Sequence, residues 1–281
     1  MSEGSGGRAK APAPRGKALG QHFLRDKRVI DRIIRAIAPS PGMTVVEIGA
    51  GTGALTFPLA QRGERIIALE VDESLCRHLG EAAKDIANIT VVCADVMSLP
   101  AEEILQRAGL IGEYVVAGNL PYYIASAIVR RFLEAPHPPR YLVVMMQKEV
   151  AENMAARPGN LTLLGACVQF YAQPQVLFSI PPSAFSPPPK VHSAVVRLDI
   201  RAQPAVMVED KEEFFKFLRA GFRAPRKQLR NALTLGLPAG PSVIDELLPR
   251  ANIDGRRRAQ TLTMEEWGRL YHTVLSSSVM S

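Results

Sequence analysis

The chain has 281 residues, of which 47% are hydrophobic and 22% are charged, and its formal net charge is +7. This length allows one large and one small domain with a substantial buried core. No uninterrupted apolar run approaches the ~20 residues that a membrane-spanning helix needs, so we expect no membrane association. The three cysteines (Cys76, Cys93, Cys167) and five histidines have neither metal-site spacing nor an even disulfide pattern. We therefore expect no metal and a reducing, cytoplasmic location.

The positive charge lies at the two ends of the chain. Residues 1–32 contain eight Lys and Arg against three Asp and Glu, and residues 201–281 contain thirteen against nine. The residues between them contain thirteen against fifteen. Basic ends on a nearly neutral body favour a polyanionic partner, with solvated surface charge as the alternative. Residues 1–16, rich in Gly, Ala, Pro and Arg, are expected to form a disordered leader.

The first predicted elements surround a glycine-rich turn. An amphipathic helix is predicted over 26–38, because apolar residues recur on one face. A buried strand at 45–48 then runs into the turn at 49–53, where Gly49, Gly51 and Gly53 let a ligand approach the main chain. The next strand ends at Glu70, where nucleotide-binding α/β folds place a carboxylate against ribose hydroxyls. A ligand-free turn, a nicotinamide enzyme and an S-adenosylmethionine-dependent methyltransferase all fit this pattern.

Strands and helices continue to alternate as far as residue 156. Further strands are predicted at 89–93, 114–118 and 140–147, and helices at 74–87, 100–108, 125–133 and 149–156. The alternation is typical of an α/β fold with a Rossmann-like, doubly wound, mostly parallel sheet. Ligands bind such sheets at the carboxyl ends of the strands. Gly49, Glu70, Asp95 and Asn119 all lie at such ends.

The rest of the chain divides into two parts. We expect a strand at 163–171, an extended proline-dense loop at 180–190 and an edge strand at 191–199. After a linker at 202–207 the pattern becomes helical, with helices at 209–222, 226–235, 242–248 and 263–276. Thr263 and Glu266 have the spacing of a capping box. We therefore predict one domain over 17–204 and a small helical domain over 205–281.

The sequence Asn-Leu-Pro-Tyr-Tyr at 119–123 indicates chemistry on an adenine amino group. This nitrogen is a poor nucleophile because its lone pair is delocalised into the ring. The side-chain oxygen of Asn119 can accept one amino hydrogen, and the Leu120 carbonyl, directed by Pro121, can accept the other. Tyr122 offers a ring on which an extruded base can stack, worth ~1–3 kcal/mol. A polar turn after a strand is the simpler alternative.

On these residues the chain resembles the ribosomal RNA adenine N6-dimethyltransferases. The segments that match in order and spacing are LGQHFL at 19–24, EIGAGTG at 47–53, Ala94-Asp95, NLPYYI at 119–124 and PPSAFSPPPKVHSAVVRL at 181–198. The resemblance implies S-adenosylmethionine as cofactor. It also implies that the substrate is a pair of adjacent adenines in the 3′-terminal hairpin loop of 16S rRNA within the small ribosomal subunit or its precursor.

The resemblance also assigns roles to individual residues. It implies that the cofactor is bound by His22, Leu24, Gly49, Gly51, Glu70, Asp95 and Asn119. It implies that Phe185 encloses the target base opposite Tyr122, with a plain core aromatic as the alternative. The basic segment 221–233 is expected to contact RNA through Arg223, Arg226, Lys227 and Arg230, several of them on one side of a helix. Where the family has a polar and basic stretch, residues 161–165 here are mainly apolar, which weakens the transfer of RNA contacts from that segment.

Three other functions compete with this interpretation. A 23S rRNA adenine methyltransferase of the antibiotic-resistance type shares the Asn-x-Pro-aromatic site. A nicotinamide dehydrogenase shares the glycine turn and the acid, but it would leave residues 119–123 unexplained. A ribosome-assembly factor whose docking matters more than its methylation could use the same surfaces. For the favoured function we expect a monomer.

Overall fold

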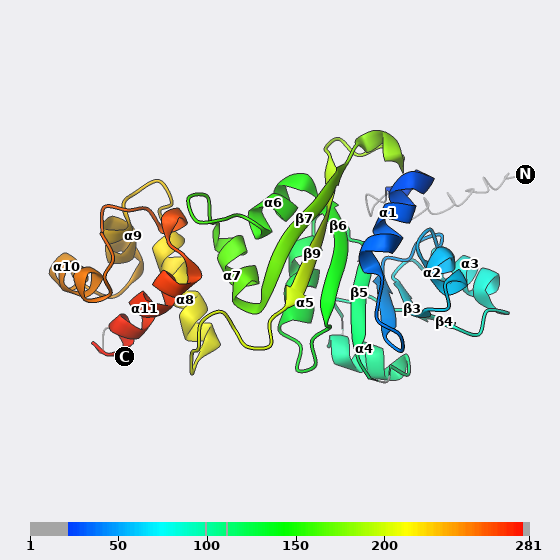
Figure 1. Cartoon of the computed structure of the whole chain (residues 1–281), viewed down its shortest axis with the longest axis horizontal. Coiled ribbons are helices and arrows are strands. Elements are labelled where there is room, and N and C mark those ends of the chain that lie inside the picture. Colours follow the sequence, from blue (N-terminus) through cyan, green and yellow to red (C-terminus); the bar gives the residue numbers. More distant parts are fainter. Residues whose placement is uncertain (1–21, 99, 111, 278–281) are drawn as a thin grey trace, which may run out of the picture.

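The computed structural model describes residues 22–98, 100–110 and 112–277. The leader predicted for residues 1–16 lies outside this range. The described chain is elongated, with a central sheet between helices and a group of further helices at one end (Figure 1). None of the described helices is long and apolar enough to cross a membrane.

The central sheet has seven strands in the order β4-β3-β2-β5-β6-β9-β7. They are β2 (Thr44–Ile48), β3 (Arg65–Glu70), β4 (Ile89–Cys93), β5 (Tyr114–Asn119), β6 (Tyr141–Gln147), β7 (Ala172–Ile180) and β9 (Ser193–Ile200). The first five in the spatial order pair in parallel, and β9 is antiparallel to both of its neighbours. The chain builds outward from β2 in both directions, so the strand order reverses between β2 and β5. Ligands bind α/β sheets in the crevice at such a switch point.

Helices cover both faces of this sheet. One face carries α1 (Lys27–Ile37), α2 (Thr56–Gln61) and α3 (Glu73–Ala83), and the other carries α4 (Ala101–Arg107), α5 (Ala125–Leu133) and α6 (Lys148–Met154). Figure 1 shows α1 in front of the sheet and α5 behind it. Because successive strand residues point to opposite faces, Val45 and Ile66 pack with the first group of helices. Val46 and Ile67 pack with the second group. The predicted doubly wound fold is therefore confirmed.

Two sequence predictions in the second half of the sheet are wrong. The segment predicted as a strand at 163–171 is the helix α7 (Leu163–Tyr171), which begins where the Thr162 hydroxyl accepts a hydrogen bond from Gly165 N at 2.9 Å. A short apolar run does not distinguish a buried helix from a buried strand. The predicted edge strand, β9, instead lies between β6 and β7. The edge strand at this end of the sheet is β7, and it contains Pro174, a residue that edge strands tolerate because they lack one set of partners.

The C-terminal helices form a core of their own. They are α8 (Lys211–Phe222), α9 (Leu229–Gly236), α10 (Pro241–Arg250) and α11 (Met264–Leu275). The predicted capping box of Thr263 and Glu266 is confirmed at the start of α11. Trp267 and Tyr271, both 0% exposed, lie at the centre of this core.

The helix α7 and the segment before it join this C-terminal core. Phe170 of α7 contacts Phe214 and Phe215 of α8, with ring centroids 5.4 and 5.2 Å apart. Leu161 is buried in the same cluster. The apolar character of residues 161–165 therefore serves packing between the two parts of the molecule. The predicted boundary at 202–207 falls in the loop between β9 and α8, although the cores on its two sides share α7.

Candidate active site

A cavity of about 330 Å³ opens at the carboxyl ends of the parallel strands. Its walls come from the turn after β2, the ends of β3, β4 and β5, and the segment that precedes α1. The residues predicted to bind cofactor or to act in catalysis lie together in this lining: His22, Leu24, Gly49, Gly51, Glu70, Asp95, Asn119, Leu120, Pro121 and Tyr122. Side chains from four strand ends thus meet around one space, as the sheet topology requires.

The glycine turn brings bare main chain to the cavity. Gly49 and Gly51 have φ values of +70° and +57°, in the left-handed region that favours glycine. A Cβ atom on Gly49 would lie 3.2 Å from the Asn119 carbonyl oxygen, and one on Gly51 would lie 3.4 Å from the Phe23 ring. Side chains at these positions would narrow the space between the turn, β5 and the N-terminal segment. The turn therefore leaves room for a ligand against the backbone.

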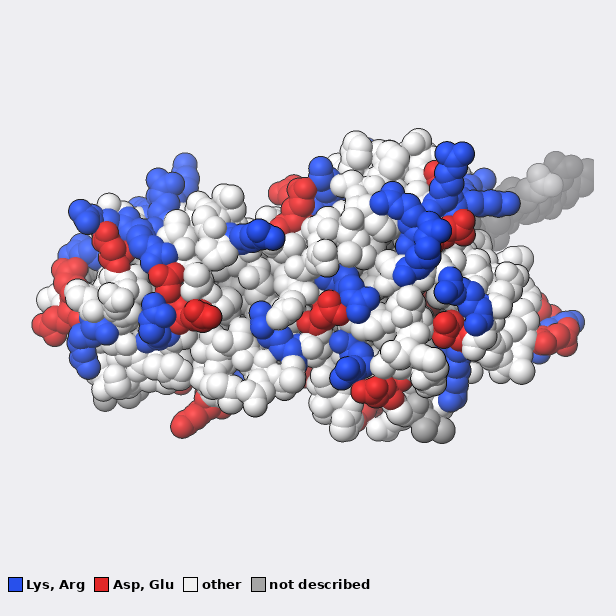
Figure 2. Space-filling model, in the orientation of Figure 1, with Lys and Arg blue, Asp and Glu red and all other residues white. Residues whose placement is uncertain are grey.

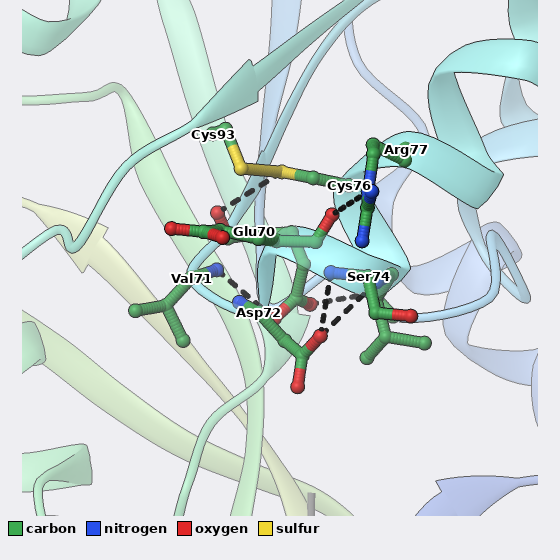
Figure 3. The surroundings of a disulfide bond; sticks show 10 residues. Glu70, Val71, Asp72, Ser74, Cys76, Arg77 and Cys93 are labelled. Carbon is green, nitrogen blue, oxygen red and sulfur yellow. Dashed lines mark hydrogen bonds between the residues drawn. A yellow bond between two sulfur atoms is a disulfide. The ribbon is translucent and has the colours of Figure 1, made fainter. Parts of the chain in front are cut away.

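The Glu70 carboxylate is held by backbone amides at the end of β3. Its Oε2 accepts from Gly51 N at 2.8 Å, and its Oε1 accepts from Val71 N and Asp72 N at 2.9 and 3.0 Å. Figure 3 shows this carboxylate beside the start of α3, where Asp72 caps the helix. Oε1 has both of its acceptor positions filled, and Oε2 keeps one. Glu70 therefore ties the glycine turn to β3 and still offers an acceptor to a hydroxyl group in the cavity.

A disulfide lies next to Glu70, which corrects the expectation that the cysteines are not paired (Figure 3). Cys76 of α3 and Cys93 at the end of β4 are bonded, with Cα atoms 5.7 Å apart (Figure 3). The pairing arises because α3 folds back beside β4, a relation that a sequence separation of 17 does not reveal. Cys167 is a free thiol.

Asp95 lies at the end of β4 with part of its carboxylate uncommitted. Its Oδ1 accepts a hydrogen bond from Met97 N at 2.8 Å, which fixes the side chain in a turn. Within the described part of the chain, Oδ2 has no hydrogen-bond partner. The side chain lines the cavity and is exposed, so this oxygen can accept from an amino group there.

Glu47 is a site residue that the sequence analysis did not identify. It lies in β2 with 2% of its surface exposed and lines the cavity. Its Oε2 accepts a hydrogen bond from the Thr56 hydroxyl at 2.6 Å. Burial raises the pKa of Glu47 to about 8, and the nearby Glu70 acts in the same direction, against the effect of the Thr56 hydrogen bond. The sequence signal that could have identified Glu47 is its position: it is an acidic residue among apolar strand residues just before the glycine turn.

Asn119 is oriented by the N-terminal segment. Its Nδ2 donates to the His22 carbonyl oxygen at 2.9 Å. Because a carbonyl oxygen only accepts, this contact assigns the amino group to His22 and leaves Oδ1 as the free acceptor. The His22 ring contacts the proline loop through Nδ1 and Pro187 O, 2.7 Å apart. The N-terminal segment and the proline loop thus close together over the end of β5.

A short two-stranded sheet completes this closure. In it β1 (Phe23–Leu24) pairs antiparallel with β8 (Phe185–Ser186), and Leu24 lies opposite Phe185. Phe185 is 5% exposed and belongs to the core cluster that also contains Leu24. It is absent from the cavity lining, whereas Phe23 and Tyr123, which the sequence analysis did not select, are part of it. A direct contact of Phe185 with the target base stays a prediction.

The cations expected to contact RNA are not on one side of a single helix, which corrects the sequence prediction. Arg223 is the C-cap of α8 and donates to Leu235 O at 2.8 Å. Arg230 in α9 forms a bidentate ion pair with Asp245, with 2.7 Å between Nη2 and Oδ2. Arg226 and Lys227 lie exposed in the turn between the helices, and among the described residues neither forms an ion pair. Figure 2 shows Lys and Arg side chains gathered over α1 and over the end formed by the C-terminal helices.

A doubly wound sheet with this glycine turn, an acid at the end of β3 and an Asn-x-Pro-Tyr sequence that begins at the end of β5 defines an S-adenosylmethionine-dependent methyltransferase of class I. Solved structures agree. The 23S rRNA methyltransferase ErmE is similar with a TM-score of 0.71 and 28% identity over 89% of this chain and 98% of that one. A dimethyladenosine transferase from Plasmodium falciparum has the same fold, with a TM-score of 0.76 and 22% identity over 92% of this chain and 99% of that one.

The chain belongs to the ribosomal RNA adenine dimethylase family, whose model matches residues 15–269. Two relatives called ribosomal RNA small subunit methyltransferase A illustrate the similarity. The relative from Dehalococcoides mccartyi (strain CBDB1) is 44% identical over 90% of this chain and 86% of its own length. The relative from Alkaliphilus oremlandii is 40% identical over 90% and 89%. The resemblance seen in the sequence is confirmed: the chain is an S-adenosylmethionine-dependent rRNA adenine dimethyltransferase, and the nicotinamide alternative is set aside.

Proposed function

We propose that this enzyme methylates N6 of two adjacent adenines in the 3′-terminal hairpin loop of 16S rRNA during assembly of the small subunit. The orientation of Asn119 carries the proposal. Its Nδ2 is committed to the His22 carbonyl, which leaves Oδ1 as the acceptor of a side chain that lines the cavity at the end of β5. The names of the small-subunit relatives support the choice of rRNA.

The residues around the cavity fit S-adenosylmethionine. Main chain at Gly49 and Gly51 gives the ligand a surface that Cβ atoms would fill. The remaining acceptor on Glu70 Oε2 suits a ribose hydroxyl, and Asp95 Oδ2 suits the adenine amino group. His22 and Leu24 close the cavity from the N-terminal side. When bound, the cofactor supplies an electrophilic methyl group on a sulfonium centre.

The chain's own groups prepare the target nitrogen. Asn119 Oδ1 accepts one amino hydrogen, and the Leu120 carbonyl accepts the other. Both bonds favour tetrahedral geometry at the nitrogen and direct its lone pair towards the cofactor side of the cavity. The Leu120 amide donates to Met145 O at 3.0 Å, which anchors this peptide to β6. Positioning of this kind supplies most of the acceleration when no strong base is needed.

Tyr122 lies beside this pair of acceptors and offers its ring to the extruded base. The ring is half-buried and lines the cavity. Stacking on an aromatic face stabilises a flipped base by ~1–3 kcal/mol. Arg226 and Lys227 would contact RNA phosphates, and we expect the enzyme to act as a monomer in the cytoplasm, where its substrate is assembled.

A large-subunit substrate is the second candidate, because ErmE, a 23S rRNA methyltransferase, is similar over 98% of its length. Undermodified small and large subunits from cells lacking this enzyme would be incubated with it and with labelled S-adenosylmethionine. Mass spectrometry of RNA fragments would then locate dimethyladenine. We expect it in the 3′-terminal hairpin of 16S rRNA. Label confined to 23S rRNA would overturn the proposed substrate and favour the second candidate.

A further inference from the structure

The Tyr122 hydroxyl is tied to a buried residue from the other side of the site. It lies 2.5 Å from the Ser193 hydroxyl oxygen, and either group can donate. Ser193 is the first residue of β9, where it pairs with Gln147 at the end of β6 and Ile180 at the end of β7, and it is 0% exposed. The two hydroxyls are 71 residues apart in sequence. The contact therefore joins the Asn-x-Pro-Tyr segment to the rigid antiparallel part of the sheet.

The Tyr122 side chain is restrained at its backbone and at its hydroxyl group. Its backbone follows Pro121, where φ is fixed, and its ring lies 6.0 Å from the His22 ring at an interplanar angle of 31°. A half-exposed tyrosine without a partner at its hydroxyl would populate several side-chain rotamers. A hydrogen bond to a fully buried group on a β-strand selects one of them. Ser193 thereby determines where the aromatic face stands relative to Asn119.

We propose that Ser193 is a positioning residue for methyl transfer, which holds the Tyr122 ring in the orientation that receives the target adenine. The proposal rests on the proposed function, because it needs an adenine stacked on Tyr122. Ser193 is fully buried and is not part of the cavity lining, so it acts through the tyrosine hydroxyl.

This role changes what is expected of Tyr122→Phe. From the sequence alone the variant should be near wild type, since the aromatic face does the stacking. With the hydroxyl anchored, phenylalanine keeps the face but loses the bond that aims it. It also leaves the buried Ser193 hydroxyl without this partner. We therefore expect Tyr122→Phe to transfer methyl groups about 3- to 10-fold more slowly, the range that one neutral hydrogen bond supplies.

The test is a double-mutant cycle with Tyr122→Phe, Ser193→Ala and both together. Single-turnover methylation of undermodified small subunits would be measured at saturating cofactor. Each single variant should be slowed by a similar factor, and the double variant should be no slower than either, because all three lack the same bond. Ser179→Ala, an exposed serine near the end of β7, is the matched control and should retain the wild-type rate.

Two further readouts separate positioning from damage to the fold. The affinity for S-adenosylmethionine, measured by calorimetry, should be unchanged in all variants. With 2-aminopurine at the target position, the fluorescence of the bound RNA should differ from wild type in the same way in both single variants, because the base stacks less well on a mobile ring. If Ser193→Ala fails to fold, Tyr122→Phe still removes the same hydrogen bond, because Tyr122 is its half-exposed partner. A wild-type rate and wild-type fluorescence for Tyr122→Phe would overturn the proposal.

Independent effects, in which the double variant shows the product of the two single losses, would also overturn it. A wild-type enzyme that does not methylate small-subunit RNA would instead contradict the proposed function. The two failures are therefore distinguishable in one set of measurements.

Discussion

Glu70 holds the glycine turn and is proposed to bind the cofactor, and its Oε2 serves both roles. Its carboxylate accepts three backbone hydrogen bonds, so Glu70→Ala would leave three amides without their acceptor. Glu70→Gln keeps the size of the side chain but replaces one acceptor oxygen by a donor. We expect it to weaken S-adenosylmethionine binding about 10- to 100-fold, the effect of losing a charge-assisted hydrogen bond. Calorimetry measures this, with Glu73→Gln on the exposed surface of α3 as control. Equal affinity in wild type and Glu70→Gln would remove Glu70 from the cofactor site.

Glu47 makes the stability of the cofactor-free enzyme depend on pH. Its pKa is about 8 in the folded chain against 4.5 for an ordinary glutamate, because burial disfavours the charged form. Between these values the folded state binds more protons than the unfolded state, so the free energy of unfolding falls as pH rises. The slope from this group approaches about 1.4 kcal/mol per pH unit and vanishes above pH 8.

Glu47→Gln should remove that slope, since an amide does not titrate. Urea unfolding of both proteins at several pH values between 5 and 9 measures this slope. The free energy of unfolding of the wild type, relative to that of Glu47→Gln, should fall as the pH rises towards 8. Parallel curves for the two proteins would show that Glu47 ionises normally despite its burial.

At the scale of elements, local sequence signals predicted the parts of the fold that are locally determined. The strand at 45–48 and the acid at Glu70 follow from an apolar run and a glycine turn, and the capping box of Thr263 and Glu266 follows from spacing alone. The helix α7 was missed because its nine residues are apolar on most sides, buried between the sheet and the C-terminal helices. Tertiary packing determines its structure, and a local sequence pattern carries no information about that packing.

Contacts between distant segments of the site could not be predicted. The hydrogen bond from Asn119 to His22 spans 97 residues, and that from Tyr122 to Ser193 spans 71. The first depends on the N-terminal segment closing over the end of β5, and the second depends on β9 lying next to β6. The sequence motifs identified which residues matter there, while the pairing among them required the fold.

The turn between α8 and α9 gives a prediction about RNA affinity. Arg226 and Lys227 are exposed there without ion-pair partners among the described residues, whereas Arg230 is paired with Asp245. Replacing Arg226 and Lys227 by alanine should lower the slope of log affinity against log salt by about 0.7–0.9 for each lost phosphate contact. Fluorescence titration of a 16S rRNA fragment measures the slope. The control is Arg62→Ala with Lys84→Ala, two exposed cations next to α2 and α3. A slope that stays at the wild-type value in the Arg226 and Lys227 variant would make this turn a solvated surface.

At the scale of the whole molecule, Phe170 couples the sheet to the C-terminal helices. It is 0% exposed, and its ring packs against Phe214 and Phe215 of α8. Phe170→Ala should cost about 3–5 kcal/mol and split thermal unfolding into two calorimetric transitions. Phe132→Ala removes an equally buried ring from the sheet core alone, so it should lower the melting temperature without splitting the transition. Identical calorimetric profiles for the two variants would show that α7 does not couple the two parts.

The central claim is that Asn119 prepares an adenine amino group for methyl transfer, and single-turnover methylation of undermodified small subunits tests it most directly. At saturating cofactor, Asn119→Ala should lower the rate by at least about 10²–10³, because the remaining Leu120 carbonyl alone cannot orient the amino group. The affinity for S-adenosylmethionine and for the subunit should remain close to wild type, and Asn160→Ala, an exposed asparagine, should leave the rate unchanged. An Asn119→Ala enzyme that still forms dimethyladenine in 16S rRNA at the wild-type rate would contradict the account.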